Sequence, residues 1–167
     1  MIKIVGDDHS PLPEGRIQGW QLCRTQGESP VKVIELAHGE LLQLCASLEE
    51  IADSLPETVD TSLCAEVAAS LVPLTSDVHR FEETILFPWL ERRYPDRQTL
   101  HESLRRLKSE HLEDEGYADE ISETLLRLTE RERLQPETVG YMLRGFFEGM
   151  RRHISTEREY LYELLEG

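Results

Sequence analysis

The sequence predicts an all-α protein: an up-down-up-down antiparallel four-helix bundle that follows an irregular N-terminal extension. Three observations lead to this class. From Ser29 onward, apolar residues recur at alternating intervals of three and four, which is the rhythm of an amphipathic helix. The rhythm is interrupted at three places, which divides the chain into four long helices. The interruptions are short, so consecutive helices are expected to lie antiparallel.

The chain of 167 residues is expected to form one bundle preceded by a short extension. Residues 1–29 hold several glycines and prolines and show no sustained period, so they are predicted to be irregular apart from one short strand at residues 2–5. Residues 30–167 are predicted to be the bundle.

The first helix is expected to start at Ser29-Pro30 and to end at residues 54–60, whose sequence is SLPETVD. The second is expected to end at residues 94–96 and contains Pro73, which should kink this helix or mark its true start. The predicted buried stripe of the first helix is Ile34, His38, Leu41, Cys45, Leu48, Ala52 and Leu55. That of the second is Leu71, His79, Glu83, Leu86 and Leu90.

The third and fourth helices are expected on either side of a break around residues 134–136. The predicted stripe of the third is Leu104, Leu107, His111, Asp114, Ala118, Ile121, Leu125 and Leu128. That of the fourth is Val139, Leu143, Phe146, Met150, His153, Glu157, Tyr160 and Leu164. Each helix therefore carries one histidine on its buried face.

Composition excludes several classes of partner. The chain has 18 Lys and Arg against 33 Asp and Glu, a net charge of −15, and this negative field disfavours nucleic acid and anionic membranes. There is no apolar run of about 20 residues and no leader-like N-terminus, so we expect a soluble cytoplasmic protein. Three cysteines without a CxxC pair argue against a disulfide framework and a zinc knuckle.

The four stripe histidines are expected to share one layer of the bundle. In an antiparallel pair, two residues face each other when both lie equally far from the turn. The midpoint of His38 and His79 is 58.5, that of His79 and His111 is 95, and that of His111 and His153 is 132. All three midpoints fall in or beside the predicted breaks, so four imidazoles should converge in the interior.

Three of these histidines have a glutamate four residues later, on the same helix face: Glu83, Glu115 and Glu157. Glu157 also lies on an apolar stripe, where an unpaired carboxylate would cost several kcal/mol, about 3 or more. Four imidazoles and two or three carboxylates suit a pair of transition-metal ions. Glu83 and Glu157 are predicted to bridge them, while Glu115 is a third ligand, an outer hydrogen-bond acceptor or a solvated residue.

Other readings of these residues stay open. Each HxxxE could be an ordinary ion pair, and the bundle could be metal-free with hydrogen-bonded histidines. Zinc or manganese would also accept these donors. His9 and His101 are off the stripes and are interpreted as surface residues. Tyr117 and Tyr160 are interpreted as packing residues, with a hydrogen bond to a metal-bound ligand as the alternative.

These residues resemble the haemerythrin family, and more closely its HHE cation-binding branch. The resemblance covers about residues 30–166. It rests on AHGE around His38, DVHRFEETILFPWLE around His79, SEHLEDE around His111 and RRHISTERE around His153. It implies a non-haem di-iron centre, two iron ions bridged by carboxylates and by oxo or hydroxo. The implied metal ligands are His38, His79, Glu83, His111, His153 and Glu157.

The chain departs from the oxygen-carrying members of this family. They have a second histidine one turn after the first on the third helix, where this chain has Glu115. Their last carboxylate follows the fourth-helix histidine by five residues, whereas Glu157 follows His153 by four. The set here is closer to the four-histidine, two-glutamate pattern of di-iron proteins linked to nitrosative stress, although those proteins usually add a cysteine-bearing N-terminal domain.

The first functional hypothesis is a di-iron protein that binds or senses O2, NO or peroxide. The second is an iron-sensing module that acts through a protein partner, with the N-terminal extension as contact surface, and the third is a metal-free helical interaction domain. No protein nucleophile or general base is evident, so any catalysis would belong to the metal. A homo-oligomer is an open alternative.

Overall fold

The computed structural model describes residues 29–166, which form four helical rods and no strand. The all-helical class is thus confirmed. The first, third and fourth rods are α1 (Pro30–Ser54), α4 (Gln98–Thr129) and α5 (Pro136–Glu166). The second consists of α2 (Thr61–Phe81), the π-helical segment η2 (Glu82–Leu86) and α3 (Phe87–Arg93). The strand predicted at residues 2–5 and all of the extension except Ser29 lie outside the described residues.

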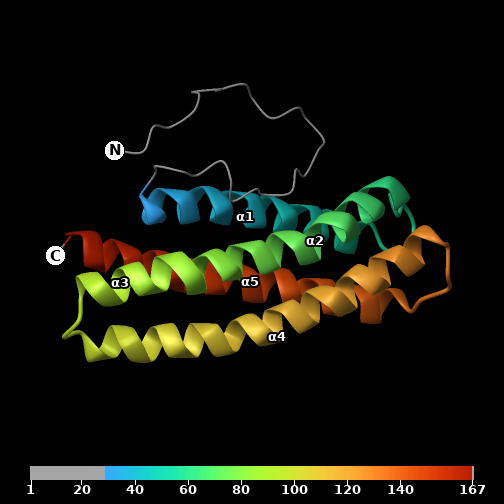
Figure 1. Cartoon of the computed structure of the whole chain (residues 1–167). Helices are drawn as coiled ribbons and strands as arrows, with labels where there is room; N and C mark the ends of the chain where they lie inside the picture. Colours follow the sequence, from blue (N-terminus) through green and yellow to red (C-terminus); the bar gives the residue numbers. More distant parts are fainter. Residues whose placement is uncertain (1–28, 167) are drawn as a thin grey trace, which may run out of the picture.

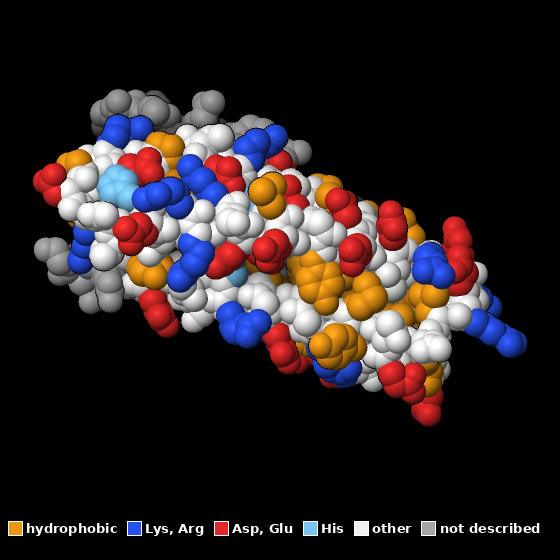
Figure 2. All heavy atoms as spheres, turned by 90° about the horizontal axis from the view of Figure 1, so that it is seen from below, with side chains coloured by type: hydrophobic (Ala, Val, Ile, Leu, Met, Phe, Trp, Pro, Cys, Tyr) orange, Lys and Arg blue, Asp and Glu red, His pale blue; other side chains and the backbone are white. Residues whose placement is uncertain are grey.

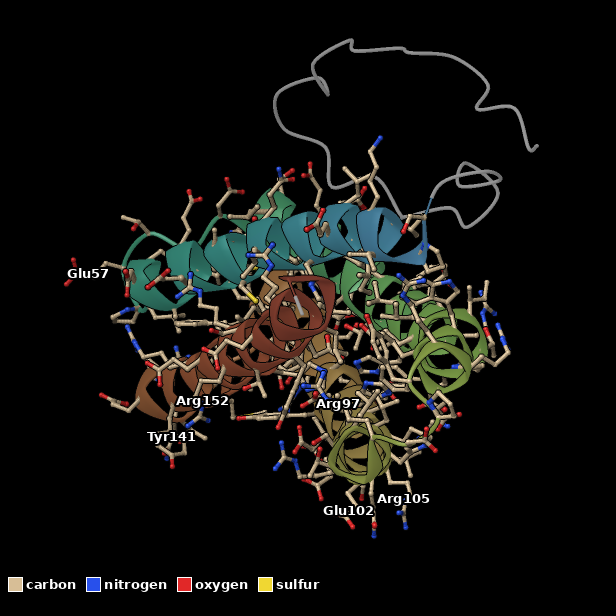
Figure 3. All side chains as sticks on the ribbon, turned by 90° about the vertical axis from the view of Figure 1, so that its left-hand side faces the viewer. Glu57, Arg97, Glu102, Arg105, Tyr141 and Arg152 are labelled. Atoms are coloured by element: carbon tan, nitrogen blue, oxygen red, sulfur yellow. The ribbon has the colours of Figure 1, made fainter. Side chains whose placement is uncertain are left out.

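The rods lie side by side (Figure 1), with α1 against α5 and α2 against α4. In Figure 1 the turns that follow α1 and α4 are at one end of the bundle and the turn between α3 and α4 is at the other. The view along the rods in Figure 3 shows the labelled side chains of Glu57, Arg105 and Tyr141 pointing outward. These three residues, one in the loop after α1 and one each on α4 and α5, face away from the core.

Local chemistry explains where the helices begin. Pro30 occupies the first turn of α1, where its missing N–H is not needed. Asp60 caps α2, because its Oδ1 accepts hydrogen bonds from the backbone N–H of Ser62 at 2.9 Å and of Leu63 at 3.1 Å. The first two predicted breaks match the observed ones. The third begins earlier than expected, after Thr129, because the helix ends where Arg131 adopts a left-handed conformation with φ 58°.

The second rod contains one wider helical turn, η2, directly before Pro88. Proline has no N–H for the usual bond to the residue four before it, and its ring crowds that carbonyl. Here the N–H of Phe87 donates to the carbonyl of Glu82, five residues back, which is the π-helical pattern. Pro73, in contrast, lies inside α2 without ending it. Glu82 and Leu86, the first and last residues of the wider turn, are both buried.

The predicted stripes are buried, with few exceptions, and the core also takes in apolar residues outside them, among them Val33, Leu44 and Leu74. The buried apolar members of the stripes are at most 5% exposed, and the stripe histidines are buried with them. The exceptions are only partly buried; they are Leu55, Glu83, Asp114, Leu128 and Tyr160. A space-filling view from below Figure 1 shows acidic and basic side chains mixed over that face, around a group of hydrophobic ones (Figure 2). Among the described helices, none has the length and apolar character that a membrane span requires.

Candidate metal centre

One histidine from each of α1, α2, α4 and α5 reaches the same region of the core. Their exposed fractions are 0% for His38, 2% for His79, 1% for His111 and 8% for His153. The loops that connect the rods span residues 55–60, 94–97 and 130–135, and the three midpoints calculated from the sequence fall inside them. Equal distance from each turn is what places the four imidazoles at one level.

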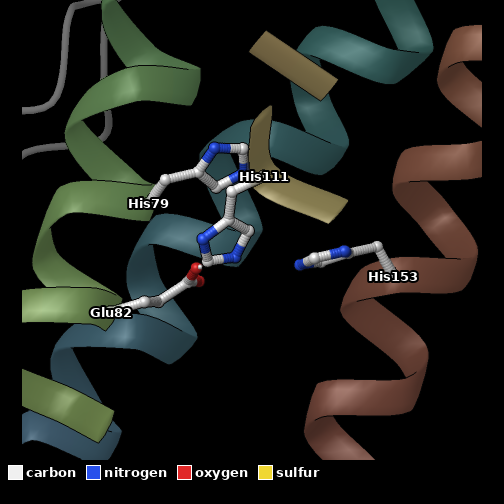
Figure 4. Close-up of side chains that lie close together, drawn as sticks. All are labelled: His79, Glu82, His111 and His153. Atoms are coloured by element: carbon white, nitrogen blue, oxygen red, sulfur yellow. Dashed lines mark ion pairs between the residues drawn. The ribbon is translucent and has the colours of Figure 1, made fainter. Parts of the chain in front are cut away.

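The rings of His79 and His111 stack on each other across α2 and α4 (Figure 4). Their centroids are 3.9 Å apart and their planes differ by 7°. The ring of His153 approaches from α5, with its centroid 5.3 Å from that of His111 and 6.1 Å from that of His79. Three imidazoles from three helices therefore line one side of the region.

Two buried carboxylates, Glu82 and Glu157, join these three histidines to the fourth. Glu82 is 1% exposed, and its two oxygens lie 3.0 Å from Nε2 of His111 and 3.6 Å from Nε2 of His38. Glu157 is 3% exposed, and its oxygens lie 2.9 Å from Nε2 of His38 and 3.6 Å from Nε2 of His153. Nε2 of His38, His111 and His153 thus faces two carboxylates in the centre.

Glu82 takes the central position that we expected for Glu83. The side chain of Glu83 is 38% exposed, and its carboxylate contacts Nδ1 of His111 at 2.8 Å, on the outer edge of that ring. The HxxxE spacing singled out Glu83, but Glu82 is three residues after His79 and so is also near its helix face. The spacing from His79 did not separate the two glutamates, since both lie within one turn of it. A ligand role for Glu83 stays a prediction.

Further carboxylates lie around the outer edges of the rings. Glu115 approaches Nδ1 of His79 at 3.2 Å, while Glu110 and Asp114 lie 3.5 and 3.6 Å from Nδ1 of His153. His101 is remote from the cluster and contacts the carbonyl of Pro95 at 3.2 Å.

The two tyrosines named in the sequence analysis take different positions. The hydroxyl of Tyr117 donates to the carbonyl of Met142 at 2.8 Å, which is a bond between α4 and α5. Tyr160 lines a small cavity that also includes Glu157.

The carboxylates and the burial act in opposite directions on the histidine pKa values. Burial alone lowers the pKa of His153, but Glu157, Glu82 and Asp114 together raise it to about 9. The pKa of His38 is raised above 6.5 in the same way by Glu157 and Glu82, against burial. Burial and the neighbouring His111 and His153 lower the pKa of His79 to about 2. The pKa of Glu157 is depressed, because two imidazoles outweigh its burial.

The donor atoms in the centre fit a pair of cations. Several buried atoms make no hydrogen bond within the described protein: Nε2 of His79 and of His153, Oε1 of Glu157, and the pair formed by Nε2 of His111 and Oε2 of Glu82, which lie 3.0 Å apart without hydrogen-bond geometry. Buried polar atoms are normally paired, so orphaned atoms that converge on one place point to an absent partner. Two groups could each hold an ion, one with donors from His79, Glu82, His111 and His153, the other with donors from His38, Glu82 and Glu157. Glu82 belongs to both.

Comparison with known proteins gives one match. A model of the Hemerythrin family, described as the Hemerythrin HHE cation binding domain, matches residues 29–165. No curated protein and no solved structure matches the chain. The matched range begins one residue before α1 and ends one residue before the end of α5, so it contains all four rods and every histidine of the cluster.

Proposed function

Because this chain belongs to the hemerythrin family, in its HHE cation-binding domain, we propose that it holds two iron ions in the bundle and binds or senses O2, NO or peroxide. The observation that carries this proposal is the convergence of unpartnered buried nitrogen and oxygen atoms on one place. Such a donor set of imidazole and carboxylate is typical of iron and of other transition metals.

The proposed ligands are the central side chains of the cluster: His38, His79, Glu82, His111, His153 and Glu157. The two-group arrangement supports Glu82 as the carboxylate that both ions share. A bound iron pair would supply the redox chemistry and the open coordination positions that a small ligand needs. The chain itself fixes the donor atoms, excludes water from them and balances the charge of the ions with two carboxylates.

The surroundings of Glu157 favour a small ligand. A cavity of about 20 Å³ is bounded by Glu157, Tyr160 and Ser103 and by apolar side chains of α3 and α4, including Phe87 and Leu104. This volume is about that of one water-sized molecule. Its apolar walls would make the entry of an anion costly, whereas an uncharged diatomic molecule loses little on leaving water. These features support O2 or NO over larger substrates.

The proposal includes the up-down-up-down order of the rods, which the alternating position of the turns in Figure 1 supports. It also includes a cytoplasmic location, with which the free thiols of Cys45 and Cys64 are consistent. Any partner that binds through the N-terminal extension stays a prediction.

Metal analysis after anaerobic purification tests the centre itself. We expect about two iron ions per chain, the stoichiometry of di-metal bundles. A protein that binds no transition metal would instead be a metal-free helical domain.

Spectroscopy of the reduced iron protein tests the ligand. We expect O2 or NO to produce a rapid and reversible change in the near-ultraviolet and visible spectrum. Slow irreversible bleaching with loss of metal would contradict this expectation and would favour the iron-sensing hypothesis.

A further inference from the structure

Glu83 and Glu115 occupy equivalent positions on two facing helices. Each follows a stripe histidine by four residues, Glu83 after His79 and Glu115 after His111. An HxxxE spacing suggests that each glutamate contacts the histidine four residues before it, but neither carboxylate does so. Glu83 lies 2.8 Å from Nδ1 of His111, and Glu115 lies 3.2 Å from Nδ1 of His79. The two motifs therefore exchange partners across the contact between the second rod and α4.

The exchange follows from antiparallel packing. His79 and His111 lie at the same level, and the chain runs in opposite directions away from them along the two rods. A side chain one turn after the histidine on either rod lies beside the ring of the other. The stacked rings, 3.9 Å apart and 7° from parallel, are held between these two carboxylates.

The atoms involved define what the carboxylates do. An ionised glutamate only accepts hydrogen bonds, so Nδ1 of each imidazole must donate its N–H to it. A neutral imidazole then has its lone pair on Nε2. In both rings Nε2 is the buried atom without a hydrogen-bond partner, and in His111 it lies 3.0 Å from the central carboxylate Glu82. The outer carboxylates thus select the tautomer that can bind a metal from the inside.

Exposure separates these two carboxylates from the central pair. The side chains of Glu83 and Glu115 are each 38% exposed, whereas Glu82 and Glu157 are 1% and 3% exposed. Neither Glu83 nor Glu115 belongs to the groups whose donor atoms lie within reach of a common ion. Their charge stays partly in water, so it can be kept without a metal at little cost.

We propose that Glu83 and Glu115 are positioning residues and not metal ligands: each holds the imidazole of the opposite rod by its Nδ1 and so prepares Nε2 for the metal. This inference rests on the proposed metal centre for its purpose, but the hydrogen bonds that it invokes belong to the protein alone. The two HxxxE motifs then act as one reciprocal unit that also ties the second rod to α4.

The first test uses the metal-free protein and nitrogen-15 NMR of the histidine side chains. We expect slowly exchanging Nδ1–H protons on both His79 and His111. The variant Glu115→Ala should lose the protected proton of His79 and keep that of His111, and Glu83→Ala should do the reverse. Glu113→Ala, an exposed acid on the same helix as Glu115, is the matched control and should change neither signal.

Loss of the signal from the histidine of the same helix would overturn the exchange of partners, and so would the absence of protected Nδ1–H protons in the unmodified protein. The conservative variants Glu83→Gln and Glu115→Gln keep an acceptor oxygen and should retain both signals. Circular dichroism of each variant shows whether the bundle is folded.

The second test separates ligands from positioning residues by Zn²⁺ titration. Glu83→Ala and Glu115→Ala should still bind about two ions at saturation, with affinity about 10- to 100-fold lower, the usual cost of losing a carboxylate behind a ligand histidine. Glu82→Ala should lower the stoichiometry. If Glu83→Ala loses an ion and Glu82→Ala does not, Glu83 is the ligand and the proposal is wrong. If the unmodified protein binds no metal, the proposed function fails while the NMR result still decides the hydrogen-bond exchange.

Discussion

Glu157 illustrates how the cluster balances its charges at the scale of single residues. Its carboxylate is 3% exposed and contacts Nε2 of His38 at 2.9 Å and Nε2 of His153 at 3.6 Å. A carboxylate in this environment must have a partner of opposite charge. Without metal that partner is a protonated imidazole, and with metal it is the ion. Protons and metal therefore compete for the same nitrogen atoms.

This competition predicts how pH affects the metal-free protein. The pKa of His153 is raised to about 9 in the folded protein, above the usual 6.5 of histidine. Its contribution to the free energy of unfolding is therefore complete below pH 6.5 and is lost as the pH rises through 9, a loss on the order of 3 kcal/mol. His38 and His111 shift in the same direction. His79, with a pKa lowered to about 2, is neutral throughout this window and adds nothing to the change.

Urea denaturation of the metal-free protein at pH 6.5 and pH 9 measures the effect, and we expect lower stability at pH 9. The affinity for metal should be higher at pH 9 than at pH 6.5, since fewer protons must be displaced from the imidazoles. His153→Gln should reduce the dependence on pH. Stability that increases between these two pH values would show that the imidazoles are not protonated in the metal-free centre.

Single histidine substitutions test which of the histidines bind metal. His153→Ala should remove most of the bound metal, because it deletes one donor of the three-imidazole group and leaves Glu157 with fewer partners. His101→Ala is the control, since His101 contacts the backbone of Pro95 on the surface. Metal content by inductively coupled plasma mass spectrometry checks both, and equal loss in the two variants would refute the ligand set.

At the scale of whole elements, α4 and α5 approach each other closely at one glycine, Gly145. A Cβ atom on Gly145 would lie 2.7 Å from the hydroxyl oxygen of Tyr117. This hydroxyl donates a hydrogen bond to the carbonyl of Met142. The ring of Tyr117 packs edge-on against Phe146, with 5.7 Å between the ring centroids. The absence of a side chain at residue 145 lets the tyrosine cross to α5. Gly149, one turn later, has nothing within 4 Å of its Cβ position.

Alanine substitution at Gly145 and at Gly149 is expected to change the stability in opposite directions. Gly145→Ala should lower the free energy of unfolding by about 1–2 kcal/mol, because Tyr117 must give up its hydrogen bond or its packing. Gly149→Ala should raise it by up to about 1 kcal/mol, the helix propensity of alanine over glycine. Thermal and urea denaturation measure both. A gain of stability in Gly145→Ala would mean that the tyrosine moves without cost.

In the second rod, helical periodicity alone does not determine which of two neighbouring glutamates faces the core. Both Glu82 and Glu83 are within one turn of His79, so the 3.6-residue period alone does not decide between them. The wider turn begins at Glu82, and in the structure Glu82 is buried while Glu83 lies at the edge. The stripe predicted for this rod was accordingly right for its apolar members and for His79, but Glu83 is only partly buried.

At the scale of the molecule, metal binding should stabilise the whole bundle, because each of the four rods contributes a proposed ligand. At a free metal concentration 100 times the dissociation constant, binding adds about 2.7 kcal/mol to the folded state. For a bundle of this size that corresponds to a rise in the melting temperature of about 10 °C.

Differential scanning calorimetry with and without Fe²⁺ under anaerobic conditions measures this rise. A chelator should reverse it, and His153→Ala should show little of it. A melting temperature that does not respond to metal would place the binding site, if there is one, away from the core.

The sequence by itself determined the four helices, two of their three breaks and the common level of the four histidines, because hydrophobic period, proline and capping residues act locally and equal spacing from the turns follows from antiparallel packing. The tertiary structure decided what the local period left open. It brought Glu82 to the centre in the place expected for Glu83, and it paired Glu83 with His111 and Glu115 with His79. These outcomes depend on the rotation of each rod about its own axis against its neighbour, which no spacing along a single helix records.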